Sequence, residues 1–377
     1  MAFHLTTDHE ERSLDALFRP ISACLKADRL NAIPDVGGLE TELTGKLRLR
    51  LQQAIKTFPF RPAIARALMI DADVRLLMEK IVLFCVGGKE SKFWVGPCVE
   101  HANFFFKVLV GGMITRYPDV DSCLYAGNDP DYDDFLSQIC KEWLASCEAS
   151  IRNRTALYDW FRFATLIHRA NDGGRLVRNL QLQKEQNVAV FRTARYIDWS
   201  AKPFTMVLIL GQSPTIDGQK LSPLSREKIR KAVFENAGYK LAPIYMGCGG
   251  TVRPRTTGIN ESHQMRKCAA EEFGVPEERF AIEATSEHTY SNFMHAAILG
   301  AAMGMPHGSR MITFPQKTQR EFIKEGMIPR ANEEVFPPFA WFGSIETGEI
   351  DGSIVFTLNA ACKDMPLCTT LWKDRFL

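Results

Sequence analysis

Four short apolar runs in the second half of the chain decide its fold: MVLILG (206–211), APIYMG (242–247), RFAIE (279–283) and RMITF (310–314). Each run is followed by a polar or glycine-rich turn and then by a helical pattern. Strands that alternate with helices predict βαβ units and a parallel sheet with helices on both faces. A later run, GSIVFTL (352–358), is a candidate for one more strand. The C-terminal half is therefore expected to be an α/β domain with a Rossmann-like parallel sheet.

The helices between these strands are expected at Ser225–Ala237, Glu261–Phe273, Thr289–Met303 and Lys317–Glu325. In the first half, apolar residues recur every three or four positions from Leu39 to Ile55, as in an amphipathic helix. Similar patterns predict helices after Pro62 and over Val99–Thr115, Asp134–Ala149, Thr155–Ala170 and Gly174–Glu185.

Only VAVFR (188–192) looks like a strand in the first half. We place the domain boundary at WSAKPF (199–204). This boundary predicts a mainly helical domain of residues 1–200, which is a candidate for a lid or for a separate module, and a Rossmann-like ligand-binding domain of residues 203–377.

The composition is that of an ordinary globular protein. The 377 residues include 46 Lys+Arg and 44 Asp+Glu, a net charge of +2, so there is no basic stripe to indicate nucleic acid. No apolar stretch reaches the about 20 residues of a membrane span, and the N-terminus lacks a secretory pattern. We therefore expect a cytoplasmic protein without a membrane partner. Its ten cysteines form no CxxC pair, so no metal site is expected, and nothing indicates an oligomeric state.

Polar residues follow each predicted strand. The loops after parallel strands gather at one edge of an open sheet, which is where ligands bind. Glycines there, such as Gly211, allow a close backbone approach, and helix N-termini suit phosphate or carboxylate. Glu261 and Glu283 are candidates for ribose hydroxyls, an ammonium group or a proton. Cationic partners would come from Arg253, Arg255, Lys317 and Arg320.

Each of these residues also has a purely structural interpretation. A glycine after a strand can simply form a turn, and Asn260 and Ser286 can cap helices. The glycine fingerprint of nicotinamide dinucleotide sites is incomplete in GQSPTI (211–216), which disfavours that cofactor. His288 and His295 lie seven residues apart without a third evident ligand, so a metal role is disfavoured.

Residues 206–326 resemble the domain found in the bacterial YdcF, SanA and ElyC proteins. The matching pieces are MVLILGQSPTIDG, IYMGCGG, NESHQM, GVPEERFAIEATSEHTYSN and ITFPQKTQR. The soluble YdcF-like branch is the most similar, but Lys317 stands where many members have histidine. The pattern falls on Gly211, Gly249, Gly250, Glu261, Glu283, Ser286, Asn292, Gln319 and Arg320.

This resemblance implies a Rossmann-like fold with a small-molecule pocket, and for the YdcF-like branch the binding of S-adenosylmethionine. Glu261 and Arg320 are then the expected catalytic residues. The expected ligand-binding residues are Gly211, Gln212, Gly249, Gly250, Glu283, Ser286, Asn292 and Gln319.

The first functional hypothesis is therefore an enzyme that binds a nucleoside-like polar ligand, such as S-adenosylmethionine, for a transferase or lyase reaction. A phosphoester or phosphoryl hydrolase is a second hypothesis, with Ser213 or Cys248 as nucleophile candidates. A ligand sensor without turnover is a third. Aromatic residues of the helical half are candidates to line the pocket or to form a core: Trp94, Phe104, Phe105, Trp160 and Phe163.

Overall fold

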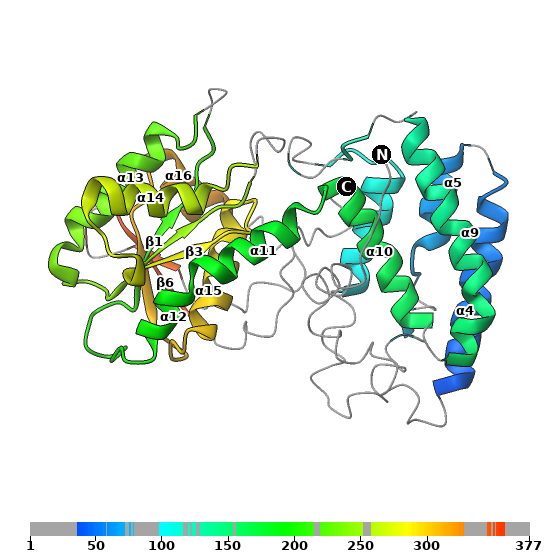
Figure 1. Ribbon diagram of the computed structural model, residues 1–377, viewed down its shortest axis with the longest axis horizontal. Helices are drawn as coiled ribbons and strands as arrows, with labels where there is room; N and C mark the ends of the chain where they lie inside the picture. Colours follow the sequence, from blue (N-terminus) through cyan, green and yellow to red (C-terminus); the bar gives the residue numbers. More distant parts are fainter. Residues whose placement is uncertain are drawn as a thin grey trace. The chain divides into compact units, whose positions relative to one another are not determined.

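The computed structural model forms two compact units, Met1–Gly174 with Pro366–Leu377, and Arg175–Met365 (Figure 1). The described residues are 36–57, 59–71, 75–76, 78, 98–115, 120, 123–125, 129–153, 156–214, 219–251, 258–327, 345–347, 350 and 352–358.

The first unit is helical, as expected. Its helices are α4 (Val36–Ala54), α5 (Phe60–Leu68), a helix at 98–105 that continues into the π-helix η1 (Phe106–Val110), α9 (Pro130–Asn153) and α10 (Ala156–Asp172). Helix α4 packs against α5, α9 and α10.

Aromatic side chains fill the interior of this first unit. Trp160 is 1% exposed, and its indole N–H donates to the carbonyl of Leu68 over 2.9 Å. Phe104, Phe105 and Phe163 are buried as well. These four aromatic residues are therefore core residues of the helical unit, whereas Trp94 lies outside the described residues.

The second unit contains the predicted α/β sheet. Its six strands are β1 (Met206–Leu210), β2 (Ile244–Cys248), β3 (Phe280–Glu283), β4 (Arg310–Thr313), β5 (Ile345–Thr347) and β6 (Ile354–Thr357). Their order is β3-β2-β1-β4-β6-β5, and the first four run parallel. Strands β6 and β5 are antiparallel additions at the β4 side. The Rossmann-like fold class is confirmed, and β5 is an element that the sequence pattern missed.

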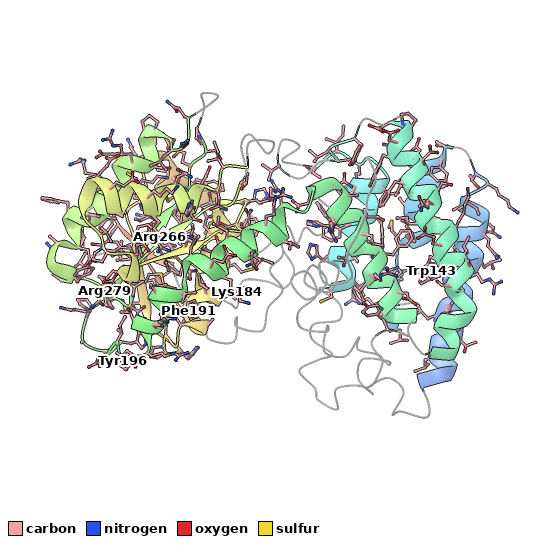
Figure 2. All side chains as sticks on the ribbon, in the orientation of Figure 1. Trp143, Lys184, Phe191, Tyr196, Arg266 and Arg279 are labelled. Atoms are coloured by element: carbon pink, nitrogen blue, oxygen red, sulfur yellow. The ribbon has the colours of Figure 1, made fainter. Side chains whose placement is uncertain are left out.

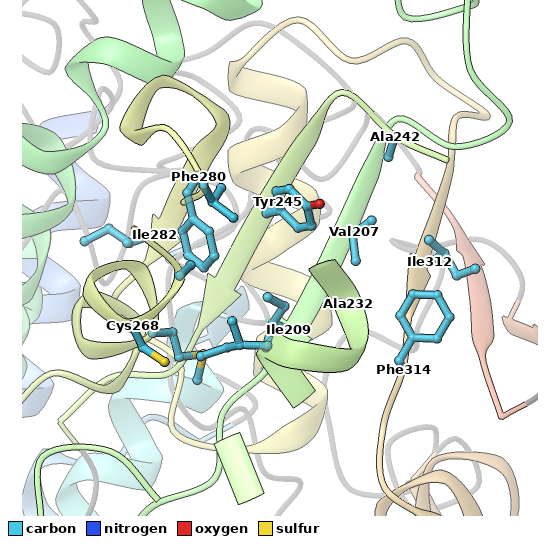
Figure 3. Close-up of a cluster of buried hydrophobic side chains, with 14 of the residues drawn as sticks. Val207, Ile209, Ala232, Ala242, Tyr245, Cys268, Phe280, Ile282, Ile312 and Phe314 are labelled. Atoms are coloured by element: carbon cyan, nitrogen blue, oxygen red, sulfur yellow. The ribbon is translucent and has the colours of Figure 1, made fainter. Parts of the chain in front are cut away.

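Helices cover both faces of this sheet (Figure 1). Helices α13 (Pro223–Glu235) and α14 (Glu261–Phe273) pack against β1, β2 and β3. Every second residue of these strands faces the two helices, for example Val207, Ile209 and Tyr245 (Figure 3). The opposite face carries α15 (Thr289–Ala302), where Phe293 makes an edge-to-face contact with Phe356. Because both faces are covered, the central strands are apolar throughout.

The local signals of α14 show why its predicted bounds agree with the structure. Asn260 caps the helix, since its side chain accepts a hydrogen bond from the backbone N–H of His263. Gly274 ends it in the left-handed conformation, at φ 65°. Beyond β4, α16 (Lys317–Glu321) continues into the π-helix η5 (Phe322–Met327), in the region where one helix was expected.

The strand predicted at 188–192 is wrong. These residues form helix α12 (Val188–Ala194), which follows α11 (Arg175–Gln186). Both helices belong to the sheet unit, so the two compact units divide at Gly174/Arg175, about 25 residues before WSAKPF. The reason is tertiary contact, since α11 contacts β3 and the guanidinium of Arg266 on α14 donates to the carbonyl of Gln186 at the end of α11. Figure 2 labels Arg266 on α14 and Lys184 on α11.

Two further observations concern the chain as a whole. Among the described residues, no helix is both long and apolar enough to cross a membrane. The described cysteines are all free thiols, and each is buried except Cys123, which is half-buried.

Candidate functional site

Glu261 is the centre of the candidate site. It is the first residue of α14, at the carboxyl edge of β2, and it is 6% exposed. Its backbone N–H donates to the carbonyl of Gly250 over 3.1 Å. The start of α14 is thus hydrogen-bonded to the glycine pair that directly follows β2.

Two glycines form a close-fitting cradle for the Glu261 carboxylate. A Cβ atom added to Gly249 would lie 2.7 Å from Oε2 of Glu261. Gly249 also has φ +149°, a conformation that side chains disfavour. A Cβ atom added to Gly211 would meet the same carboxylate oxygen and lie 2.6 Å from the carbonyl oxygen of Cys248. The ends of β1 and β2 therefore approach Glu261 with bare backbone.

Lys228 supplies the opposite charge at this edge. It lies on α13, is 3% exposed, and its Nζ donates to the carbonyl of Leu210 over 3.1 Å. Burial lowers the pKa of Lys228 to about 8, and the charge of Glu261 partly opposes that shift. Leu210 is the last residue of β1 and directly precedes Gly211, so both charges meet at the end of one strand.

Glu283 is the last residue of β3 and is 1% exposed. Its carboxylate accepts hydrogen bonds from neighbouring residues of the chain. Its Oε1 accepts hydrogen bonds from the backbone N–H and the hydroxyl of Thr285, at 2.8 and 2.6 Å. Ser286 donates its backbone N–H to both carboxylate oxygens. Nδ1 of His295 on α15 lies 3.3 Å from Oε1 and 2.9 Å from the Thr285 hydroxyl. This carboxylate holds the turn after β3 in shape.

The pKa of Glu283 reflects this environment. Burial acts to raise it, but the contacts with His295, Ser286 and Thr285 together lower the pKa below its ordinary value. Glu283 is therefore ionised at neutral pH, with its charge directed into its own turn rather than toward an opening.

Ser286 and Asn292 support the same turn. The hydroxyl of Ser286 donates to Oδ1 of Asn292, and both residues are buried. The backbone N–H of Gly250 donates to the carbonyl of Ser286 over 2.7 Å, and that of Gly249 donates to the carbonyl of Glu283 over 3.0 Å. The predicted residues at the ends of β2 and β3 thus form one connected network with the start of α14.

The remaining predicted residues lie on the β1 and β4 side. The carbonyl of Gln212 accepts the hydroxyl of Ser225 on α13. Oε1 of Gln319 on α16 accepts Nζ of Lys228 over 2.7 Å. The Arg320 guanidinium lies against Gly352, just before β6, on the far side of β4 from Glu261. Arg253 and Arg255 lie outside the described residues.

The N-terminus of α14 is closed to an anion, contrary to what its position suggested. Its first-turn N–H groups already donate within the chain: Glu261 to Gly250, Ser262 to Gly249, and His263 and Gln264 to Asn260. A phosphate would have to displace these bonds. The polar group that this helix presents at the edge is the Glu261 carboxylate.

Cys248 lacks what a nucleophile requires, and Ser213 is a loop residue. Cys248 is fully buried, and burial followed by the nearby Glu283 charge raises the pKa of its thiol. The thiol is therefore protonated at neutral pH, which makes it a packing group. Ser213 is half-buried in the loop after β1.

A surface groove of about 820 Å³ lies at α13 and the end of α14 and contains none of the predicted site residues. Its charged side chains pair with one another, Arg226 with Glu272 and Arg230 with Glu227. We place the site at the strand edge instead, because the buried charges and bare backbone gather there.

Sequence reasoning missed Lys228 and His295 as members of this cluster. Lys228 lies within a charged helical stretch, SREKIRK (225–231), in which no pattern separates it from its solvent-exposed neighbours. His295 was weighed as a metal ligand against a core or surface role, but not as a partner of Glu283. No family model, curated protein or solved structure matches this chain.

Proposed function

We propose that the sheet unit is a small-molecule enzyme that binds a polar, nucleoside-like ligand at the carboxyl edge of β1 and β2. The observation that carries this proposal is the Glu261 carboxylate, nearly buried between Gly211 and Gly249, with a charge that acts on the buried Lys228. Burying a charge is costly unless it is paired. A buried carboxylate among close-fitting glycines, with a buried lysine of opposite charge at the same strand end, is typical of a site that binds a ligand or moves a proton.

The chemistry of this edge favours a ligand that presents a hydrogen-bond donor or a positive charge. The carboxylate of Glu261 is an acceptor, and the N–H groups at the start of α14 are already used. An ammonium, a sulfonium or a sugar hydroxyl fits such a group, whereas a phosphate does not.

S-adenosylmethionine is the first ligand to test. The choice comes from the resemblance of residues 206–326 to the YdcF-like branch. The ammonium and ribose hydroxyl groups of this molecule are hydrogen-bond donors, and its sulfonium carries a positive charge, so each suits the Glu261 carboxylate. In this proposal Glu261 contacts the ligand or accepts its proton, while Gly211 and Gly249 allow it to approach the backbone. Arg320, on the β4 side, would hold a carboxylate.

The test compares ligand binding in three proteins. Calorimetry with S-adenosylmethionine should give saturable binding to the unmodified chain and a loss of at least about tenfold in affinity for Glu261→Gln. Glu271→Gln, an exposed carboxylate on the same helix, is the matched control and should bind normally. Equal melting temperatures of the two variants would show that the loss is local. Normal binding to Glu261→Gln would remove Glu261 from the site.

Product analysis separates the functional classes. Incubation with S-adenosylmethionine, followed by mass spectrometry of small molecules, should reveal a transferred group or a cleavage product if the protein is an enzyme. Tight binding without products would favour a sensor. Absence of binding, with activity in a phosphoester screen containing divalent metals, would favour the hydrolase hypothesis instead.

A further inference from the structure

Lys228 lies at the point where the connections of the sheet change direction. The chain leaves β1 toward β2 on one side, while β4 lies on the other side of β1. Nζ of Lys228 bonds to the carbonyl of Leu210 at the end of β1 and to Gln319 on the helix that follows β4. The gap between such strands is the usual ligand-binding crevice of an open α/β sheet. A buried ammonium group therefore bridges the two walls of this crevice.

Glu261 is an opposite charge that acts on this ammonium group. Its carboxylate lies against Gly211, the residue after Leu210, and its charge acts on Lys228. Among the other groups that the structure describes at this edge, Gln319 is neutral, Cys248 holds its proton, and Glu283 is bound within its own turn with His295. Lys228 and Glu261 thus bring opposite charges to the end of β1, and because a charge interaction is mutual, Lys228 favours the ionised form of Glu261.

We propose that Lys228 is a positioning residue that keeps the Glu261 carboxylate ionised and fixed at the crevice, so that the site accepts the cationic or hydroxyl end of its ligand. Only the ligand in this inference rests on the proposed function. The effect of Lys228 on Glu261 does not depend on which molecule binds.

A purely structural role explains the arrangement less well. Lys228 has apolar neighbours on α13, because Ile229 and Ala232 belong to the buried cluster under this helix. An apolar side chain at position 228 would fill the space without a desolvated charge, and buried ion pairs often stabilise a protein no more than apolar residues do. What an apolar residue cannot do is lower the pH at which Glu261 loses its proton.

The direct test is the titration of Glu261 in the full chain. With ¹³C-labelled glutamate, the Glu261 carboxyl signal is assigned by its absence in Glu261→Gln and followed against pH by NMR. In Lys228→Met the midpoint should rise by about 1–3 pH units, the usual effect of one nearby opposite charge. Lys228→Arg should restore a low midpoint. Lys240→Met makes the same chemical change at an exposed position and should leave the midpoint unchanged.

A second variant covers the case in which Lys228→Met does not fold. Gln319→Glu adds a negative charge beside Lys228, which would compete for the ammonium group and raise the Glu261 midpoint. An unchanged midpoint in the folded variants of both positions would overturn the inference.

Binding measurements connect the pair to the ligand. The pH below which S-adenosylmethionine affinity falls should move upward in Lys228→Met together with the titration midpoint. If the midpoint moves but the unmodified chain binds no S-adenosylmethionine, the positioning role stands and the proposed ligand is wrong. If binding occurs and the midpoint stays in place, the ligand stands and the positioning role is wrong.

Discussion

The side chain of Asn187 exchanges two hydrogen bonds with the backbone of Ile282, each 2.8 Å long. Ile282 lies on β3, the strand at one end of the sheet order. An edge strand normally leaves its backbone groups open to another chain. Here the amide of Asn187, between α11 and α12, takes the place of a neighbouring strand, and Gln183 adds a bond to the N–H of Ala284.

Asn187→Leu should destabilise the sheet unit by about 2–4 kcal/mol, because it leaves a buried N–H and a buried C=O of Ile282 without their partner. Chemical denaturation measures this change. Gln181→Leu, an exposed amide on α11, is the control and should change stability by less than about 0.5 kcal/mol. Equal effects of the two substitutions would mean that the Asn187 bonds contribute no net stability.

Glu283→Gln should lower stability by about 2–4 kcal/mol at neutral pH, since an amide has a single acceptor oxygen and the turn uses both carboxylate oxygens. The folded pKa of Glu283 lies below its ordinary value, so its contribution is present above pH 4.5 and is lost as the pH falls through the folded pKa. Urea denaturation between pH 7 and pH 3 should therefore show the two proteins converging in acid. Glu278→Gln, at an exposed position, should follow the unmodified protein throughout.

Gly249→Ala should displace the Glu261 carboxylate, because the new methyl group would lie 2.7 Å from its Oε2. We expect ligand affinity to fall more than tenfold and stability to fall by about 1–3 kcal/mol from the backbone strain. Gly274→Ala also introduces backbone strain, at φ +65°, but in open space. A comparable loss of affinity in Gly274→Ala would show that strain alone, and not the cradle, explains the effect.

Lys228 should give the protein a pH-dependent stability above neutrality. The pKa of Lys228 in the folded protein is about 8, below the ordinary 10.5. Between these two pH values the unfolded chain binds more protons than the folded chain, so the free energy of unfolding increases as the pH rises. The gain is about 3 kcal/mol across this interval. Buried tyrosines and cysteines oppose it, so the measured quantity is the difference between the unmodified chain and Lys228→Met. A difference that is constant from pH 7.5 to pH 10 would contradict the shifted pKa.

The sequence by itself determined the local elements of the sheet unit. Helix α14 was predicted with its observed bounds, because Asn260 and Gly274 are signals that act within a few residues. The strands β1 to β4 and their parallel class followed from apolar runs alternating with helical patterns. These predictions succeeded because propensity, capping and periodicity are properties of neighbouring residues.

Tertiary structure decided what those neighbours cannot specify. VAVFR has the composition of a strand but folds as α12, since the edge of β3 is already occupied by Asn187 and Gln183. Glu283 was expected to face a ligand, yet its carboxylate is bound by Thr285, Ser286 and His295. Lys228 became part of the site only when the order of the strands brought α13 and α16 together. The polar contacts of a site depend on strand order and on helix register, which join residues far apart in the chain.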